Sequence, residues 1–185
     1  MKKYFLLLGL LLPLGLSAQT TIEEEFNGSS TLEWTQFSDK RGKVVIQNDG
    51  MFLSAKKATK EVSTSADIPI ETDQDFIIEA ELIIPKIASF TCFGIKLNEE
   101  AAYIMGKKTS YIYSQGEWTN QRIKLNISSN NTITLGLKYT NSRCVAILNN
   151  MEIGELHITE GLTNPRIEFY TNSSMYIKSL KITQY

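Results

Sequence analysis

The chain has 185 residues, of which 42% are hydrophobic and 21% are charged, and these proportions exclude a largely disordered protein. Lysine and arginine together number 19 against 20 aspartates and glutamates, so the formal net charge is −1. Nucleic-acid-binding domains normally carry a basic excess, and the charge balance therefore disfavours that class of protein. Isoleucine (21 residues) and threonine (17) far outnumber alanine (9), and this excess of β-branched residues favours strands over helices.

Residues 1–18, MKKYFLLLGLLLPLGLSA, have the three parts of a secretory signal peptide: two lysines, an apolar stretch and a small-residue cleavage site. The apolar stretch is about 13 residues long, whereas roughly 20 are needed to cross a bilayer. We therefore expect residues 1–18 to be removed. Residues 19–185 should then form one domain that has no stable membrane span and is secreted or periplasmic.

The clearest strand signal is the segment DFIIEAELII at 75–84, in which apolar residues recur at every second position. A period of two is the period of a strand, and it predicts one face made of Phe76, Ile78, Ala80, Leu82 and Ile84. The same alternation predicts a strand over 121–127, with Ile123, Leu125 and Ile127 facing inward.

Short polar turns separate further strand candidates and indicate tight hairpins. Asn149-Asn150 suits a two-residue turn because asparagine tolerates positive φ better than most residues. Similar hairpins are predicted around 106–108 and 48–50. About a dozen strands are expected after residue 18, with no helix of ten residues, and this pattern predicts an all-β sandwich, jelly roll or barrel.

The order of these segments resembles the concanavalin A-like lectin/glucanase superfamily, in its laminin-G-like form and the related 3-keto-disaccharide hydrolase domain. The resemblance rests on the order EEEFNGSSTLEWTQF, DFIIEAELII, FGIKL, a tyrosine-rich hairpin, GEW, VAILNNMEIGEL, IEFY and MYIKSLKI. Asn149-Asn150 stands where that pattern usually has Asn-Gly. The resemblance implies an antiparallel two-sheet β-sandwich (a jelly roll) with one concave sheet, and carbohydrate on the concave face or the loops beside it.

Glucanases of that superfamily resemble one another through E-x-D-x-E on one strand, with two of the carboxylates as nucleophile and general acid. Here Glu79 and Glu81 stand on one face of the predicted 75–84 strand, about 6.7 Å apart along it. The flanking positions are Ile77 and Ile83, so the third acidic residue is missing. A solvated strand face explains the pair as well, and a hydrolase that uses Glu79 and Glu81 is kept as the alternative.

The tyrosines of the predicted hairpin around 106–108 suggest a binding surface. Tyr103, Tyr111 and Tyr113 are expected near one another on one face, with Ile104 and Ile112 facing inward and with Lys96 and Arg122 on the same sheet. Tyrosine offers a flat ring for stacking on a sugar and a hydroxyl for hydrogen bonds. The competing interpretation is that these tyrosines are half-buried residues that cover the core. Trp118, at the start of a strand, is expected in the core or at its rim.

No cofactor is predicted. Cys92 and Cys144 fall inside predicted strands and favour buried free thiols over a disulfide, and with the single His157 they do not make a zinc site. Calcium stays open, because alternate acidic residues in ETDQD, Glu71, Asp73 and Asp75, offer hard oxygen ligands.

The sequence therefore favours a non-catalytic, lectin-like module that binds a glycan on the concave face. A glycoside hydrolase is the first alternative. The second is a secreted adhesion or structural domain that meets a protein partner through an exposed sheet edge.

Overall fold

The computed structural model describes residues 19–27, 30–47, 49–122, 124–125 and 127–185, and this part of the chain contains strands and turns but no helix. The proposed signal peptide, 1–18, lies outside the described residues. Within them, there is no helix of the length and apolar character that a membrane span requires.

The strands form two antiparallel sheets. The larger contains β1 (Thr20–Glu24), β2 (Phe37–Ser38), β3 (Gly42–Gln47), β4 (Gly50–Ala55), β6 (Phe76–Ile83), β11 (Thr132–Thr140), β12 (Arg143–Leu148), β13 (Met151–Leu156) and β15 (Ser174–Gln184). Its order is β13-β12-β11-β6-β15-β4-β3-β2, and β1 pairs with the C-terminal half of β15.

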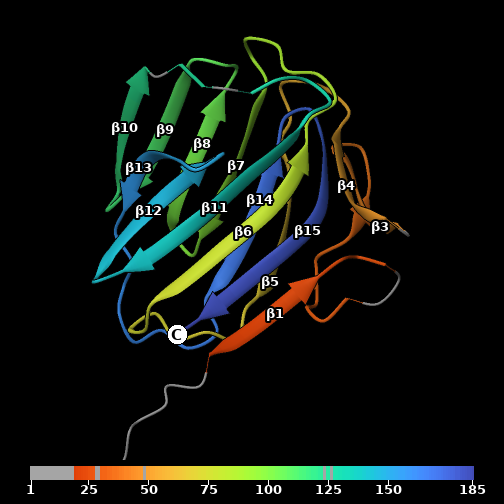
Figure 1. Ribbon diagram of the computed structural model, residues 1–185. Helices are drawn as coiled ribbons and strands as arrows, with labels where there is room; N and C mark the ends of the chain where they lie inside the picture. Colours follow the sequence, from red (N-terminus) through yellow and green to blue (C-terminus); the bar gives the residue numbers. More distant parts are fainter. Residues whose placement is uncertain (1–18, 28–29, 48, 123, 126) are drawn as a thin grey trace, which may run out of the picture.

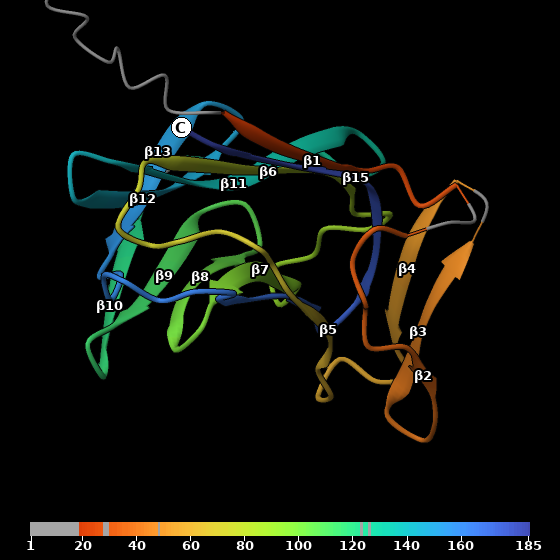
Figure 2. The same ribbon diagram turned by 90° about the horizontal axis from the view of Figure 1, so that it is seen from below.

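The smaller sheet contains β5 (Val62–Asp67), β7 (Cys92–Leu97), β8 (Glu100–Met105), β9 (Thr109–Ser114), β10 (Glu117–Arg122) and β14 (Arg166–Thr171). Its order is β10-β9-β8-β7-β14-β5. Figures 1 and 2 show the two sheets as two layers. Figure 2 also shows that β2, β3 and β4 bend away from the rest of the larger sheet, toward the side of the sandwich where β5 lies. The predicted fold class, an antiparallel two-sheet β-sandwich, is confirmed.

Alternation along the strands places the core between the sheets. In β6 the predicted inward residues are fully buried, and Phe93, Ile95 and Leu97 of β7 are buried opposite them. Removing this apolar surface from water is the main stabilising contribution in such a sandwich. The other alternate residues of both sheets form the two outer faces.

The predicted hairpin around 106–108 is confirmed, since β8 and β9 pair through it, and so is the hairpin at Asn149-Asn150, where both asparagines have positive φ. The strand predicted over 121–127 was wrong in its bounds, because the strand present, β10, ends at Arg122. Leu125 and Ile127 are nevertheless buried, so the apolar alternation there reflects loop packing against the core. Ile123 lies outside the described residues.

Candidate functional site

The outer face of the six-stranded sheet carries a cluster of aromatic side chains. The register places Tyr103 of β8 directly opposite Tyr111 of β9, and Tyr113 of β9 opposite Trp118 of β10. The three tyrosines are half-buried, while Ile104 and Ile112 on the other face are 0% and 2% exposed. The three tyrosines therefore share the outer face of this sheet, where they are half-buried, and we call Tyr103, Tyr111, Tyr113 and Trp118 the aromatic cluster.

Trp118 joins the cluster together. Its ring centroid lies 5.1 Å from that of Tyr103 and 4.9 Å from that of Tyr113, with interplanar angles of 49° and 48°. Trp118 is nevertheless 58% exposed, so it belongs to the rim and not to the core. An exposed indole held at fixed positions beside two phenols offers flat apolar surface that costs little conformational entropy on binding.

The cluster rests on a buried tyrosine. Tyr170 of β14 is 1% exposed, and its ring centroid lies 4.3 Å from that of Tyr103. The ring reaches Tyr103 across Gly94 of β7, the residue that pairs with both tyrosines. Any Cβ on Gly94 would collide with the Tyr170 hydroxyl, so the glycine makes room for the ring. The motif FGIKL thus provides a gap that an aromatic residue from the next strand fills.

Polar groups lie beside the rings. Lys96 Nζ is 3.2 Å from Glu168 Oε1 and 5.5 Å from the centroid of Tyr170. Partial burial by itself lowers the pKa of Lys96, but the Glu168 carboxylate outweighs this effect and the net pKa lies above its usual value. Burial raises the pKa of Tyr103, although the Lys96 ammonium opposes that shift. The face therefore presents the Lys96–Glu168 ion pair next to the phenol of Tyr103. Arg122 ends β10 on the same face and is exposed.

A cavity of about 410 Å³ opens between the aromatic cluster and strand β7. It is lined by Glu61, Cys92, Tyr103, Met105, Tyr111 and Trp118. Its walls are mostly apolar, with one carboxylate at the edge, a composition typical of sites for small organic groups.

Glu79 and Glu81 lie elsewhere. Both are exposed on the outer face of the nine-stranded sheet, where Glu79 pairs in register with Gly136 and Lys181. The core separates them from the aromatic cluster, so the structure does not bring the two candidate sites together. In the outer face of the six-stranded sheet, no described strand carries two carboxylates at alternate positions.

The remaining candidate groups are also separate. Cys92 and Cys144 are free and buried, as the sequence favoured, and burial raises their pKa values to about 11 and about 12. The ETDQD carboxylates do not form a cluster: Glu71 accepts a hydrogen bond from Gln74, and Asp75 accepts one from Asn141. Across the described ranges, no group of three or more His, Cys, Asp or Glu side chains is placed to hold a metal ion.

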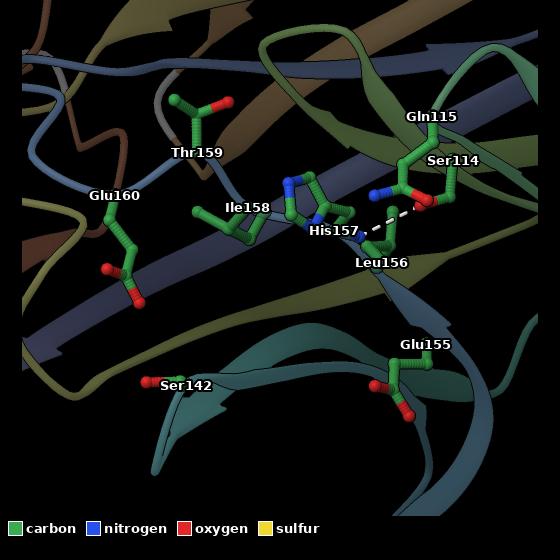
Figure 3. Close-up of a pocket in the computed structure, with 9 residues that line it drawn as sticks. All are labelled: Ser114, Gln115, Ser142, Glu155, Leu156, His157, Ile158, Thr159 and Glu160. Atoms are coloured by element: carbon green, nitrogen blue, oxygen red, sulfur yellow. Dashed lines mark hydrogen bonds between the residues drawn. The ribbon is translucent and has the colours of Figure 1, made fainter.

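A second cavity, of about 520 Å³, lies beside His157 at the end of β13 (Figure 3). The backbone N–H of His157 donates to Ser114 Oγ at 2.9 Å, but the imidazole ring is exposed and makes no hydrogen bond or ion pair within the described structure. Figure 3 shows Glu155 and Glu160 pointing away from the ring, and this cavity therefore brings no set of reactive groups together.

Sequence reasoning missed several members of the binding face, namely Trp118 as an exposed ring, Tyr170 as its support, and Glu61 and Glu168 as its carboxylates. Strand register could have identified Trp118, because a two-residue turn between β9 and β10 pairs Trp118 with Tyr113 and so places both on the same face. No local sequence signal indicated Glu61, Glu168 or Tyr170. Glu168 and Tyr170 belong to β14, and Glu61 directly precedes β5. The sequence does not show that β14 lies next to β7, or that β5 lies next to β14.

No protein-family model matches the chain, and no curated protein matches it in sequence. Solved structures match its fold. The β-glucanase of Bacillus licheniformis has a TM-score of 0.60 at 11% identity, over 89% of this chain and 98% of that one. The endo-β-1,3-glucanase from Pyrococcus furiosus has a TM-score of 0.61 at 10% identity, over 88% and 93% of the two chains.

Two further matches differ in extent. The carbohydrate binding module CBM66 from Bacillus subtilis has a TM-score of 0.51 at 12% identity, over 78% of this chain and 91% of the module. A sialidase matches at a TM-score of 0.61 and 10% identity over 89% of this chain, which corresponds to only 18% of the sialidase. At these identities the likeness concerns the fold, and the chain has the concanavalin A-like jelly-roll sandwich fold.

Proposed function

We propose that this protein is a glycan-binding module that acts outside the cytoplasm, after removal of residues 1–18, and that the glycan lies across the aromatic cluster. The observation that carries the proposal is the exposed Trp118 ring held between Tyr103 and Tyr113 beside a 410 Å³ cavity. Sugar rings present flat C–H faces that stack on such rings, and their hydroxyls suit the neighbouring Lys96 and Glu168.

The structural neighbours support a carbohydrate ligand. They include a carbohydrate binding module and several glucanases with the same fold. Fold alone does not carry function from one protein to another, so the proposal rests on the aromatic cluster and takes the neighbours as support.

The geometry favours binding over hydrolysis. A retaining or inverting glycosidase needs two carboxylates that flank one glycosidic bond. Glu79 and Glu81 are on the sheet opposite the aromatic cluster, and Glu168 on the cluster's own sheet is paired with Lys96. A hydrolase using Glu79 and Glu81 would have to bind its substrate on a different face from the one that carries the aromatic rings.

Tryptophan fluorescence gives a direct test. The chain has two tryptophans; Trp34 is 7% exposed in the core, so a ligand that stacks on the outer face should change the emission of Trp118 alone. The purified protein would be titrated with a panel of soluble polysaccharides, and Trp118→Ala should abolish the fluorescence change and weaken binding measured by calorimetry.

Tyr176→Ala is the matched control, because Tyr176 is a 37% exposed aromatic residue on the nine-stranded sheet. It should bind like the parent protein. Absence of binding to every glycan by a folded sample, or equal loss in both variants, would refute the proposal and favour the adhesion alternative.

A further inference from the structure

Charge is divided between the two ends of the sandwich. At one end, toward which the arrowheads of β6, β8 and β10 point in Figure 1, several loops meet through backbone hydrogen bonds. Lys56 N–H donates to the Arg41 carbonyl at 3.0 Å, Gly106 N–H to the Thr91 carbonyl at 2.8 Å, and Leu125 N–H to the Lys107 carbonyl at 3.1 Å. These bonds join loop 39–41 to loop 56–61, and they join loops 84–91, 106–108 and 124–125 to one another. We call the end of the sandwich that carries these five loops the basic end.

The basic end carries nine exposed cations in the loops 39–41, 56–61, 84–91, 106–108 and 124–125: Lys40, Arg41, Lys56, Lys57, Lys60, Lys86, Lys107, Lys108 and Lys124. The same loops contain two carboxylates, Asp39 and Glu61. Among the described residues, Arg41 is the one cation of this set with an ion pair, to Asp39 at 2.9 Å. The eight lysines therefore remain available to an anionic ligand.

The opposite end has the reverse charge. Its loops 68–75, 98–99, 115–116, 141–142 and 157–165 contain five carboxylates, Glu71, Asp73, Asp75, Glu99 and Glu160, and no lysine or arginine. A chain with a net charge of −1 therefore has a strongly positive end. Such an asymmetry steers anionic molecules toward one part of the surface and raises their rate of association.

The basic end borders the aromatic cavity on two sides. Glu61, which lines the cavity, directly follows Lys60, while Met105, on the other side of the cavity, directly precedes the turn that holds Lys107 and Lys108. A polymer that crosses strands β5, β14, β7, β8 and β9 over the cavity would meet lysines at both ends of its path.

From this arrangement we infer that the glycan is an acidic polysaccharide, with carboxylate or sulfate groups along its chain. The inference rests on the proposed function. The aromatic cluster takes the apolar faces of the sugar rings, and the lysines of loops 56–61 and 106–108 take the acid groups on either side. Glu61 is the carboxylate that opposes such a ligand, so its charge should weaken binding.

The test compares polygalacturonate, an acidic polysaccharide, with a neutral β-glucan by calorimetry on the full chain. We expect binding to polygalacturonate that weakens strongly when NaCl is raised about tenfold, because salt screens exposed charges. Lys57→Gln/Lys60→Gln should weaken binding on the order of threefold to tenfold, given the modest strength of exposed ion pairs. Glu61→Gln should strengthen it.

Lys138→Gln/Lys178→Gln is the matched control, because it removes the same charge from two exposed lysines of the nine-stranded sheet that, like Lys57 and Lys60, form no ion pair within the described residues. It should leave binding unchanged, while Trp118→Ala should weaken it. An equal loss in both lysine variants would show a general charge effect and would overturn the assignment to the basic end.

Other outcomes separate the two proposals. Binding of the neutral glucan as tightly as the acidic polymer, without any effect of Lys57→Gln/Lys60→Gln, would overturn the acidic-ligand inference and leave glycan binding intact. Binding of neither polymer, nor of any other glycan tested, would overturn both. Equal binding to anionic phosphatidylglycerol vesicles or to duplex DNA through the same lysines would also overturn the assignment of a polysaccharide.

Discussion

Tyr170 lies across Gly94, its register partner on the neighbouring strand, and so supports Tyr103 from below. A Cβ on Gly94 would lie 2.8 Å from Tyr170 Cζ and would collide with the Ala102 carbonyl oxygen. Gly94→Ala should therefore lower the free energy of unfolding by about 1–3 kcal/mol, as overpacking does. It should also weaken glycan binding, because Tyr103 loses its support. Urea unfolding and a glycan titration of the same sample measure both effects.

Tyr170→Phe is the companion variant. The buried Tyr170 hydroxyl has only the Cys92 thiol, a weak hydrogen-bonding group, as a polar neighbour, so its removal leaves no strong hydrogen-bonding group unpaired. The variant should be at least as stable as the parent protein. A clear loss of stability would contradict this and would show that the contact between the hydroxyl and the Cys92 thiol stabilises the packing beneath Tyr103.

The tyrosines of the aromatic cluster should affect binding more than stability. Tyr111→Ala removes a half-buried surface ring, and we expect a loss of about 0.5–1.5 kcal/mol in binding with a small change in melting temperature. Tyr139→Ala provides the contrast, because Tyr139 is 3% exposed and stacks on Phe76 at 5.2 Å. That variant should lose about 3 kcal/mol or more of stability. Similar melting temperatures for the two variants would contradict this division.

The carboxylates of the nine-stranded sheet should have no part in glycan binding on the opposite face. Glu79→Gln and Glu81→Gln should leave the affinity for a bound glycan unchanged, because the core separates them from the aromatic cluster. If the protein hydrolyses any glycoside, the same two variants decide the alternative: a large drop in rate would establish the pair as catalytic.

Two buried thiols should make the free energy of unfolding depend on pH in the alkaline range. Burial raises the pKa of Cys92 from 9.0 to about 11 and that of Cys144 from 9.0 to about 12. Above pH 9 the unfolded chain therefore releases these protons before the folded chain does, and the free energy of unfolding falls until the folded thiols also ionise. The slope should be about 1.4 kcal/mol per pH unit for each thiol.

Urea unfolding between about pH 8 and pH 11 measures that slope. Cys144→Ala should make the slope shallower, whatever its effect on stability at neutral pH. An unchanged slope would mean that groups other than this thiol control the alkaline transition.

Calcium should have little effect on this fold. Glu71, Asp73 and Asp75 do not converge into a ligand set, and two of them hydrogen-bond to protein groups. The melting temperature should therefore be the same in calcium and in a chelator. A rise of several degrees with calcium would show that the ETDQD loop rearranges around the ion.

The sequence alone determined the strands and their inner faces. Burial alternates in β6 because one side of a strand must face the core, and the period of two in DFIIEAELII records this directly. The same logic placed Tyr103, Tyr111 and Tyr113 on one face, since a short turn fixes the register of neighbouring strands. The apolar alternation after Arg122 wrongly predicted that the strand continues to residue 127, because buried loop residues can produce the same pattern as a strand.

Only the tertiary structure decided which strands from distant parts of the sequence lie together. Tyr170 reaches Tyr103 because β14 inserts beside β7, and Glu79 is separated from the aromatic cluster because β6 belongs to the other sheet. The net charge of −1 gave no indication of the basic end, because net charge does not show where charged residues lie in the fold. The lysines of the basic end are scattered from residue 40 to residue 124 and come together only in the loops where the strands end. Local sequence fixes the direction in which a side chain points, whereas its non-local neighbours depend on strand order, which is set by the packing of the whole sandwich.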